Sequence, residues 1–292
     1  MAKKVKPERL QPRSQAGEIW HRLCKNKSAM IGLVILCIIV FFALTADILF
    51  DEMLVTKQNG KIRNLPPNAE HLFGTDCYGR DILTRIVFGS RISLTIGVTG
   101  ALISLAFGAI LGSISAYYGG KLDNVLMRLM DMLMSIPTTL MALCLVAALG
   151  RSTFNLLFAI ALAYTPNFTR LVRSSILTVV DQEYVEAARA CGMRDFGIIF
   201  KEIMPNAVGP IIVQTTQSIS SIILEASALS YIGMGVQLPT PEWGAMVSEG
   251  REYLRQLPHM TIFPGLAILL TTLSFNLLGD GLRDAFDPRL KD

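Results

Sequence analysis

Five polar side chains recur at helical spacing inside an apolar stretch of this 292-residue chain, and they are the first residues whose pattern could do chemistry. A polar group facing lipid is expensive, so such a stripe faces either a water-filled cavity or a neighbouring helix. The stripe predicts a translocation pathway lined by hydrogen-bonding groups, with interhelical hydrogen bonding as the alternative. Its members are Gln214, Gln217, Ser218, Ser221 and Glu225.

A short charged segment, Asp181 to Gly192, is the second such pattern. Asp181 is expected to cap the start of a helix, and Glu183 and Glu186 complement the positive charge of that start. Arg189 complements the helix end, and Gly192 can adopt the left-handed conformation that terminates it. A rigid exposed helix of this kind can fit a groove on a soluble partner and follow its motion, whereas the plain alternative is a connector.

Catalysis by this chain is not expected. The sequence contains no phosphate-binding loop of the G-x-x-x-x-G-K-[S/T] type and no nucleophile with a paired base. The three histidines and five cysteines are scattered without ligand spacing, so neither a metal site nor a disulfide framework is predicted. A membrane-embedded enzyme would need a convergent set of residues that this pattern does not supply.

Long apolar runs dominate the composition. Hydrophobic residues make up 51% of the chain and charged residues 17%, with a mean hydropathy of +0.46. A helix needs about 20 mostly apolar residues to cross a bilayer, and six runs qualify. The sequence therefore predicts an all-α integral membrane protein with six transmembrane helices, at 28–50, 92–116, 125–149, 152–172, 207–231 and 260–280.

Charge distribution predicts the orientation and the boundaries. Lys and Arg concentrate in the segments that share a side with the N-terminus, so both termini are expected in the cytoplasm and nucleic acid is not an expected partner. The first apolar run is too long for a signal-peptide core and is expected to be an uncleaved anchor. The expected parts are a cytoplasmic segment 1–27, a first span 28–50, an extracytoplasmic segment 51–91, and a transmembrane domain 92–292 with a cytoplasmic coupling loop 173–206.

Two of the expected spans carry further features. Small residues at every fourth position of the second span predict close helix packing, and they are Gly100, Ser104, Gly108 and Gly112. In the third span, Arg128 and Asp131 lie on one helix face, where they are expected to neutralise each other, with a role in transport as the alternative. Pro137 predicts a kink in the same helix.

The charged segment resembles the EAA loop of binding-protein-dependent ABC importer permeases. Glu186, Ala187 and Ala188 are followed by Gly192 after four positions and by Pro205 thirteen positions later, which is the spacing of that loop. Such a loop usually ends Ile-x-Leu-Pro, and here Glu202-Ile203-Met204-Pro205 is a conservative variant. The resemblance implies that ATPase coupling involves Glu183, Glu186, Ala187, Ala188, Arg189, Gly192 and Pro205.

Further blocks resemble the peptide and nickel permeases of that family and cover most of the chain. The long segment between the first two spans is similar to that of the C-type permease subunit. The blocks are His71–Asp76 with Gly79–Asp81, Tyr117–Gly120 with Met127, Arg128 and Asp131, Leu229–Gly244, and Phe275–Asp284.

The resemblance implies a type I ABC importer permease in the cytoplasmic membrane of a prokaryote. The implied partners are a second permease in a heterodimer, two cytoplasmic ATPases that use ATP and Mg, and an external solute-binding protein. The implied substrate is a dipeptide or oligopeptide, with a nickel chelate or glutathione as alternatives. A secondary transporter driven by an ion gradient is the remote alternative.

Overall fold

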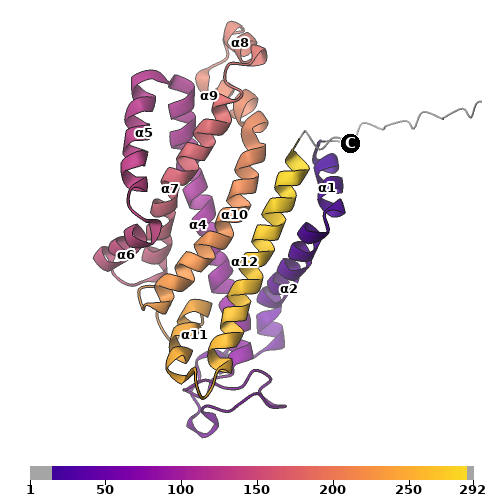
Figure 1. Cartoon of the computed structure of the whole chain (residues 1–292), viewed down its shortest axis with the longest axis vertical. Coiled ribbons are helices and arrows are strands. Elements are labelled where there is room, and N and C mark those ends of the chain that lie inside the picture. Colours follow the sequence, from indigo (N-terminus) through magenta and orange to yellow (C-terminus); the bar gives the residue numbers. More distant parts are fainter. Residues whose placement is uncertain (1–14, 288–292) are drawn as a thin grey trace, which may run out of the picture.

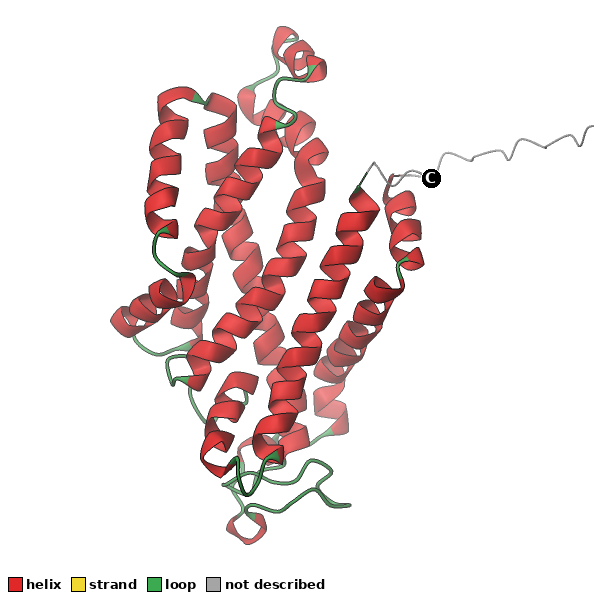
Figure 2. Cartoon of the chain, viewed as in Figure 1, coloured by secondary structure: helices red, strands yellow, loops and turns green. Residues whose placement is uncertain are grey.

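The computed structural model describes residues 15–287, and its regular elements are all helical (Figures 1 and 2). Residues 1–14, the first half of the expected cytoplasmic segment, lie outside the described residues. The longest helices form a bundle that runs along the long axis of the molecule. In chain order the elements are α1 (Gln15–Lys25), α2 (Lys27–Leu49), α3 (Met53–Thr56), η1 (Gly60–Ile62), α4 (Ile82–Tyr118), α5 (Gly120–Met134), α6 (Thr138–Leu149), α7 (Thr153–Leu177), α8 (Glu183–Ala190), α9 (Asp195–Gly197), η2 (Ile198–Ile203), α10 (Met204–Tyr231), α11 (Trp243–Gly250), η3 (Arg251–Tyr253) and α12 (His259–Phe286).

Four helical stretches are long and apolar enough to cross a membrane: α2, α4, the stretch Asp195–Tyr231 that ends with α10, and α12. The pair α5 and α6 gives a fifth span if its two bent halves are counted together. The described part of the chain is therefore an all-helical membrane protein with four or five candidate spans.

The third expected span is two helices rather than one kinked helix. α5 ends at Met134 and α6 begins at Thr138, with a bend of 84° between them. Pro137 lacks a backbone N–H and disfavours helical geometry at the residue before it, so the helix stops instead of bending through the proline. The expectation of a single helix over 125–149 was wrong in this respect.

The second expected span begins earlier than the apolar pattern indicates. α4 starts at Ile82, because the Asp81 carboxylate caps it by accepting a 2.7 Å hydrogen bond from the backbone N–H of Thr84. Arg85 and Arg91 lie within this first part of the helix, and their charges hid it from a hydropathy reading. α4 therefore includes residues 82–91, the last part of the expected extracytoplasmic segment 51–91.

The most extensive helix contact joins α4 to α7. A Cβ added at Gly108 would lie 2.4 Å from Cβ of Phe168, and one at Gly112 would lie 2.6 Å from the carbonyl oxygen of Thr169. One turn before Gly108, the Ser104 hydroxyl donates a 3.0 Å hydrogen bond to the Ala161 carbonyl of α7. Small residues at these positions let the two backbones approach, as in other membrane helix pairs.

α7 packs against α4, α5, α6 and α10 on one side, while its other side is exposed. Twelve of its residues are buried, and its buried Thr165 and Thr169 hydroxyls bond to carbonyls one turn earlier. A helix face packed against protein can carry polar residues that would be costly against lipid. This explains why α7 has the length of a span without the hydropathy of the others.

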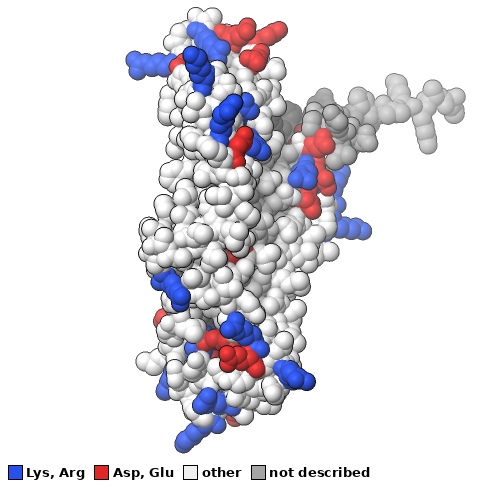
Figure 3. Space-filling view, turned by 60° about the vertical axis from the view of Figure 1, so that its left-hand side comes forward, with Lys and Arg blue, Asp and Glu red and all other residues white. Residues whose placement is uncertain are grey.

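The two ends of the bundle differ in what they carry. α8, the turn between α4 and α5, α1 and the end of α12 gather at one end, and the loop before α4 lies with α11 at the other (Figure 1). Asn26, between α1 and α2, donates a 3.0 Å hydrogen bond to Asp284 of α12. Charged side chains cluster towards both ends, with a mostly uncharged band between them (Figure 3). This distribution suits a bilayer around the middle of the bundle.

Candidate coupling element and translocation cavity

α8 projects from one end of the bundle and is anchored there by one fully buried side chain. Val185 packs in a cluster with Ile198 and Ile203 of η2. The side chains of Glu183, Glu186 and the other polar residues of α8 face solvent. The helix is therefore fixed on one face and free on the other, as a docking element requires.

The end of α8 is closed by Gly192. With φ of +77°, Gly192 donates a backbone hydrogen bond of 2.9 Å to the Arg189 carbonyl, and Met193 donates one of 3.1 Å to the Ala188 carbonyl. This pair of bonds is a Schellman motif, which favours glycine at the left-handed position. At the other end, the residue that precedes α8 is Gln182, and its side chain makes no capping bond. The expectation that Asp181 caps this helix was wrong.

Two tyrosines at the end of α4 hold the segment that follows α8. The hydroxyls of Tyr117 and Tyr118 donate hydrogen bonds of 2.8 and 3.1 Å to the two oxygens of the Asp195 carboxylate. The Arg189 guanidinium of α8 lies 5.0 Å from the centre of the Tyr117 ring, a cation–π contact. We call Tyr117, Tyr118, Asp195 and Arg189 the tyrosine clamp.

A second polar contact extends the tyrosine clamp into the bundle. Arg173 of α7 donates two hydrogen bonds of 2.6 Å to the Asp123 carboxylate of α5, and Ser115 of α4 donates one of 2.5 Å to the same group. Bidentate arginine–carboxylate contacts are among the most directional in proteins. These bonds join α4, α5 and α7 near the end of α4 that carries the tyrosine clamp.

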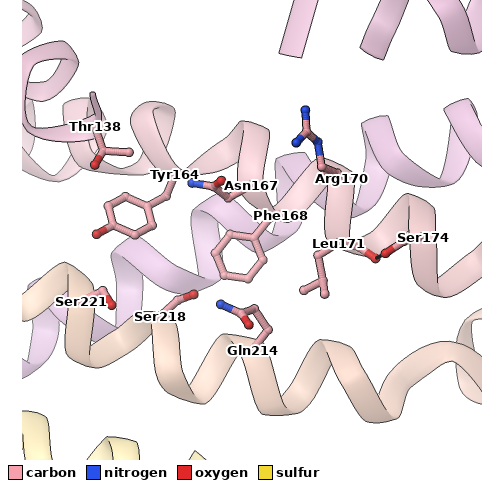
Figure 4. A pocket seen from close by; sticks show the side chains of 10 residues that line it. All are labelled: Thr138, Tyr164, Asn167, Phe168, Arg170, Leu171, Ser174, Gln214, Ser218 and Ser221. Carbon is pink, nitrogen blue, oxygen red and sulfur yellow. Dashed lines mark hydrogen bonds between the residues drawn. The ribbon is translucent and has the colours of Figure 1, made fainter. Parts of the chain in front are cut away.

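A cavity of about 470 Å³ opens between α7 and α10, beside the start of α6 (Figure 4). Six of its lining side chains are polar and make no hydrogen bond to another described residue of the chain. Unpaired polar groups at membrane depth are tolerated only where they face water, a ligand or another protein. The six are Thr138, Tyr164, Asn167, Gln214, Ser218 and Ser221.

The polar stripe expected along one helix is divided between two faces of α10. Gln214, Ser218 and Ser221 line the cavity. Gln217 instead faces α12, where it donates a 2.9 Å hydrogen bond to Asp280 and accepts one of 3.3 Å from Arg283. Glu225 lies one turn beyond Ser221 and accepts a 3.2 Å hydrogen bond from Thr139 of α6. The structure thus gives Gln217 a helix-packing contact and places the remaining residues at or next to the cavity.

Arg128 and Asp131 do not pair with each other. Asp131 forms an ion pair with Arg170 of α7, which itself lines the cavity, and Arg128 is exposed without an ion pair among the described residues. The spacing expectation failed because the neighbouring helix α7 offers a cation to the same carboxylate. The i, i+3 spacing allows Arg128 and Asp131 to pair within one helix, but it does not show whether another helix supplies a cation to Asp131.

Comparison with known proteins gives this geometry a context. Residues 105–292 match the family model described as binding-protein-dependent transport system inner membrane component, and residues 14–67 match the N-terminal TM domain of oligopeptide transport permease C. The dipeptide transport system permease protein DppC of Alkalihalophilus pseudofirmus is 46% identical over 94% of this chain and 90% of its own length.

This chain belongs to the binding-protein-dependent transport permease family.

Other relatives agree with this assignment. The di/tripeptide transport system permease DppC of Pseudomonas aeruginosa is 40% identical, covering 94% of this chain and 92% of its own. The glutathione transport system permease GsiD of Escherichia coli is also 40% identical, covering 98% and 94%. Among solved structures, the MetNI methionine ABC transporter in inward-facing form aligns with a TM-score of 0.59 at 15% identity, over 70% of this chain and 98% of that one.

The resemblance to ABC importer permeases of the C type is thereby confirmed. The permease is a transport subunit of the bacterial inner membrane and works with ATPase and binding-protein partners, so it does not itself catalyse hydrolysis. The similarity to MetNI, at this identity, supports the fold alone.

Sequence reasoning missed a buried ion cluster at the end of the permease opposite α8. Arg80 donates 2.7 Å hydrogen bonds to Asp76 and Glu249, and Arg85 bonds the same two carboxylates at 2.7 and 2.6 Å. All four side chains are at most 8% exposed. We call them the four-charge cluster, which ties the loop before α4 to α11. Glu249 lies more than 160 positions from Arg80 and Arg85 in the sequence, so no local spacing could predict their contact. The block His71–Asp81, which resembles the peptide permeases, was the one sequence feature that pointed to this region.

Proposed function

We propose that this permease carries short peptides across the cytoplasmic membrane as one half of an ABC importer. Support comes from the cavity between α7 and α10, where six polar side chains have no hydrogen-bond partner within the described chain. The relatives named above as dipeptide and di/tripeptide permeases suggest the class of solute. A cavity of about 470 Å³ falls within the range of roughly 300–1,000 Å³ that small ligands occupy in proteins.

The proposed fold is that of a type I importer permease with six spans. The count includes α2, α4, the bent pair α5 and α6, α7, α10 and α12. α7 qualifies by its length and its packing against α4, α5, α6 and α10, although its hydropathy is lower. Six spans place the described ends and α8 on one side, which is the cytoplasmic side by the charge bias of the sequence.

The proposed assembly is a heterodimer with a second permease, two ATPases and an external binding protein. ATP and Mg are used by the ATPases and no cofactor is assigned to this chain. The second permease completes the wall of the cavity between α7 and α10. The binding protein delivers solute to the end that carries α11 and the four-charge cluster.

In the proposed mechanism, α8 follows the ATPases. Its exposed Glu183 and Glu186, together with Ala187 and Ala188, enter a groove of one ATPase, and closure of the ATPase pair displaces the helix. The tyrosine clamp and the Asp123–Arg173 contact then carry the displacement to α4, α5 and α7. The cavity opens to the outside in one state and to the cytoplasm in the other.

Charge reversal in α8 tests this coupling. Glu186→Lys is expected to abolish peptide uptake into proteoliposomes and to weaken ATPase retention, because the exposed carboxylate faces the partner. Lys121→Glu is the matched control and is expected to transport normally, since it reverses an exposed charge at the same end that forms no ion pair among the described residues. Normal uptake by the Glu186→Lys complex would overturn the assignment of α8 as the coupling helix.

Glutathione is the second candidate solute, because the GsiD relative is a glutathione permease. Uptake of labelled dipeptide, glutathione and a nickel chelate by the same reconstituted complex, each with its cognate binding protein, separates the three. Dipeptide uptake that exceeds the other two at equal concentration supports the proposal. Uptake of glutathione or the nickel chelate without dipeptide uptake contradicts it.

A further inference from the structure

Glu225 is a carboxylate with one oxygen bonded and the other free. Its Oε2 accepts the 3.2 Å hydrogen bond from Thr139, while its Oε1 is buried and has no hydrogen-bond partner among the described residues. No Lys, Arg or His side chain of the described chain forms an ion pair with it. A buried carboxylate oxygen without a partner is costly, so its site favours an ammonium or guanidinium donor from outside the chain.

This carboxylate is not itself part of the cavity lining, but residues next to it in the structure line one end of the cavity. Ser221, one helical turn earlier on α10, lines the cavity and is separated from Glu225 by a rise of about 6 Å. Thr138, next to the Thr139 that bonds Glu225, lines the cavity too. In Figure 4 Thr138, Tyr164 and Ser221 occupy the same end, and none of their side-chain hydroxyls bonds to another described residue.

The two ends of the cavity differ in charge. At the other end in Figure 4 lies Arg170, whose guanidinium is already paired with Asp131. The end near Glu225 therefore has a carboxylate without an ion-pair partner among the described residues, and the hydroxyl groups of Thr138, Tyr164 and Ser221 line the same end. A ligand that satisfies both features has a cationic nitrogen with several N–H donors, and the α-ammonium group of a peptide fits this description.

We propose that Glu225 binds the α-ammonium group of the transported peptide, with Thr138, Tyr164 and Ser221 as nearby hydroxyl groups. This inference rests on the proposed function of the cavity as the solute pathway. It goes beyond that function by giving the permease a preference for solutes with a free amino terminus, oriented with that terminus towards Glu225.

Protection of an engineered cysteine tests the proposal in the full complex with its second permease and ATPases. Ser221→Cys is labelled with a small aqueous thiol reagent, and labelling is followed at that site by mass spectrometry because native cysteines are also present. The binding protein is omitted so that its own selectivity does not enter. The ligands are Ala-Ala and N-acetyl-Ala-Ala, which differ only in the ammonium group.

Ala-Ala is expected to protect the engineered thiol at a concentration at least roughly ten-fold lower than N-acetyl-Ala-Ala, the scale of one hydrogen bond to a charged group. Glu225→Gln is expected to remove this difference, and Glu225→Asp to retain part of it. The variant Thr139→Val, which deletes only the donor to Oε2, is the matched control and is expected to retain the preference for Ala-Ala.

Two results would overturn the inference. In one, the Glu225→Gln complex keeps the full preference for Ala-Ala, so the carboxylate does not contact the ammonium group. In the other, Glu225→Gln loses the second permease on purification, so the carboxylate pairs with a cation of that subunit. If neither ligand protects the engineered thiol in the complex with Glu225 intact, the cavity itself is not the pathway and the proposed function fails with it.

Discussion

The hydroxyl of Tyr117, in the last turn of α4, donates a 2.8 Å hydrogen bond to Asp195, which lies five residues beyond the end of α8. This bond joins a membrane helix to the element proposed to contact the ATPases. Tyr118 donates a second hydrogen bond to the same carboxylate, and the Arg189 guanidinium of α8 contacts the Tyr117 ring.

Loss of the tyrosine clamp should uncouple hydrolysis from transport. Asp195→Asn with Tyr117→Phe is expected to reduce the peptide molecules imported per ATP several-fold while the complex still assembles, because α8 keeps its own attachment through Val185. The measurement is the ratio of uptake to phosphate release in proteoliposomes. Tyr184→Phe, which changes an exposed tyrosine of α8 outside the clamp, serves as the control. An unchanged ratio in the double variant would contradict the role of the clamp.

Gly108→Ala should destabilise the contact between α4 and α7. The added Cβ would lie 2.4 Å from Cβ of Phe168, so one backbone must move, at an expected cost of about 1–3 kcal/mol. Gly265→Ala in α12 is the matched control, since a Cβ at that position meets no atom within 4 Å. Thermal unfolding of the detergent-purified complex should show a lower midpoint for Gly108→Ala alone. Equal midpoints for the two variants would refute the close packing.

Breaking the four-charge cluster should be more damaging than removing an exposed charge. Arg85→Ala leaves Asp76 and Glu249 with one cation between them in a buried site, at an expected cost of about 3–5 kcal/mol. Arg255→Gln, which removes an exposed arginine at the same end, is expected to change stability by less than about 0.5 kcal/mol. The yield of membrane-inserted protein and its unfolding midpoint report the difference. Similar stability for both variants would show that the cluster contributes little.

Cys77 should react slowly with thiol reagents near neutral pH. Burial raises the pKa of the Cys77 thiol, and the nearby carboxylates of Asp76 and Glu249 raise it further. Since the thiolate is the reactive form, a raised pKa leaves less of it near neutral pH. Site-resolved alkylation is expected to be at least about ten-fold slower at Cys77 than at the exposed Cys191, with the Cys77 rate still rising at about pH 9. A Cys77 rate that levels off below about pH 8 would contradict the direction of the shift.

Local sequence patterns predicted most of the long helices and one helix end. Apolar runs indicated the long helices because crossing hydrocarbon needs an uninterrupted apolar length, and glycine at 192 marked a helix end because its backbone adopts φ of +77° without strain. The same reasoning described the third span poorly. Pro137 signalled a disturbance, but the choice between a kink and an 84° break depends on what surrounds the two halves.

What the sequence determined by itself is a set of helices, an exposed charged helix before Pro205, and a polar stripe in an apolar segment. Only the tertiary structure decided which members of that stripe share a cavity, since Gln217 turns to Asp280 while Gln214 and Ser218 do not. It likewise decided that Asp131 pairs with Arg170 rather than Arg128. The physical reason is common to both cases: helical spacing specifies a face, whereas the partner on that face is supplied by another helix distant in the chain.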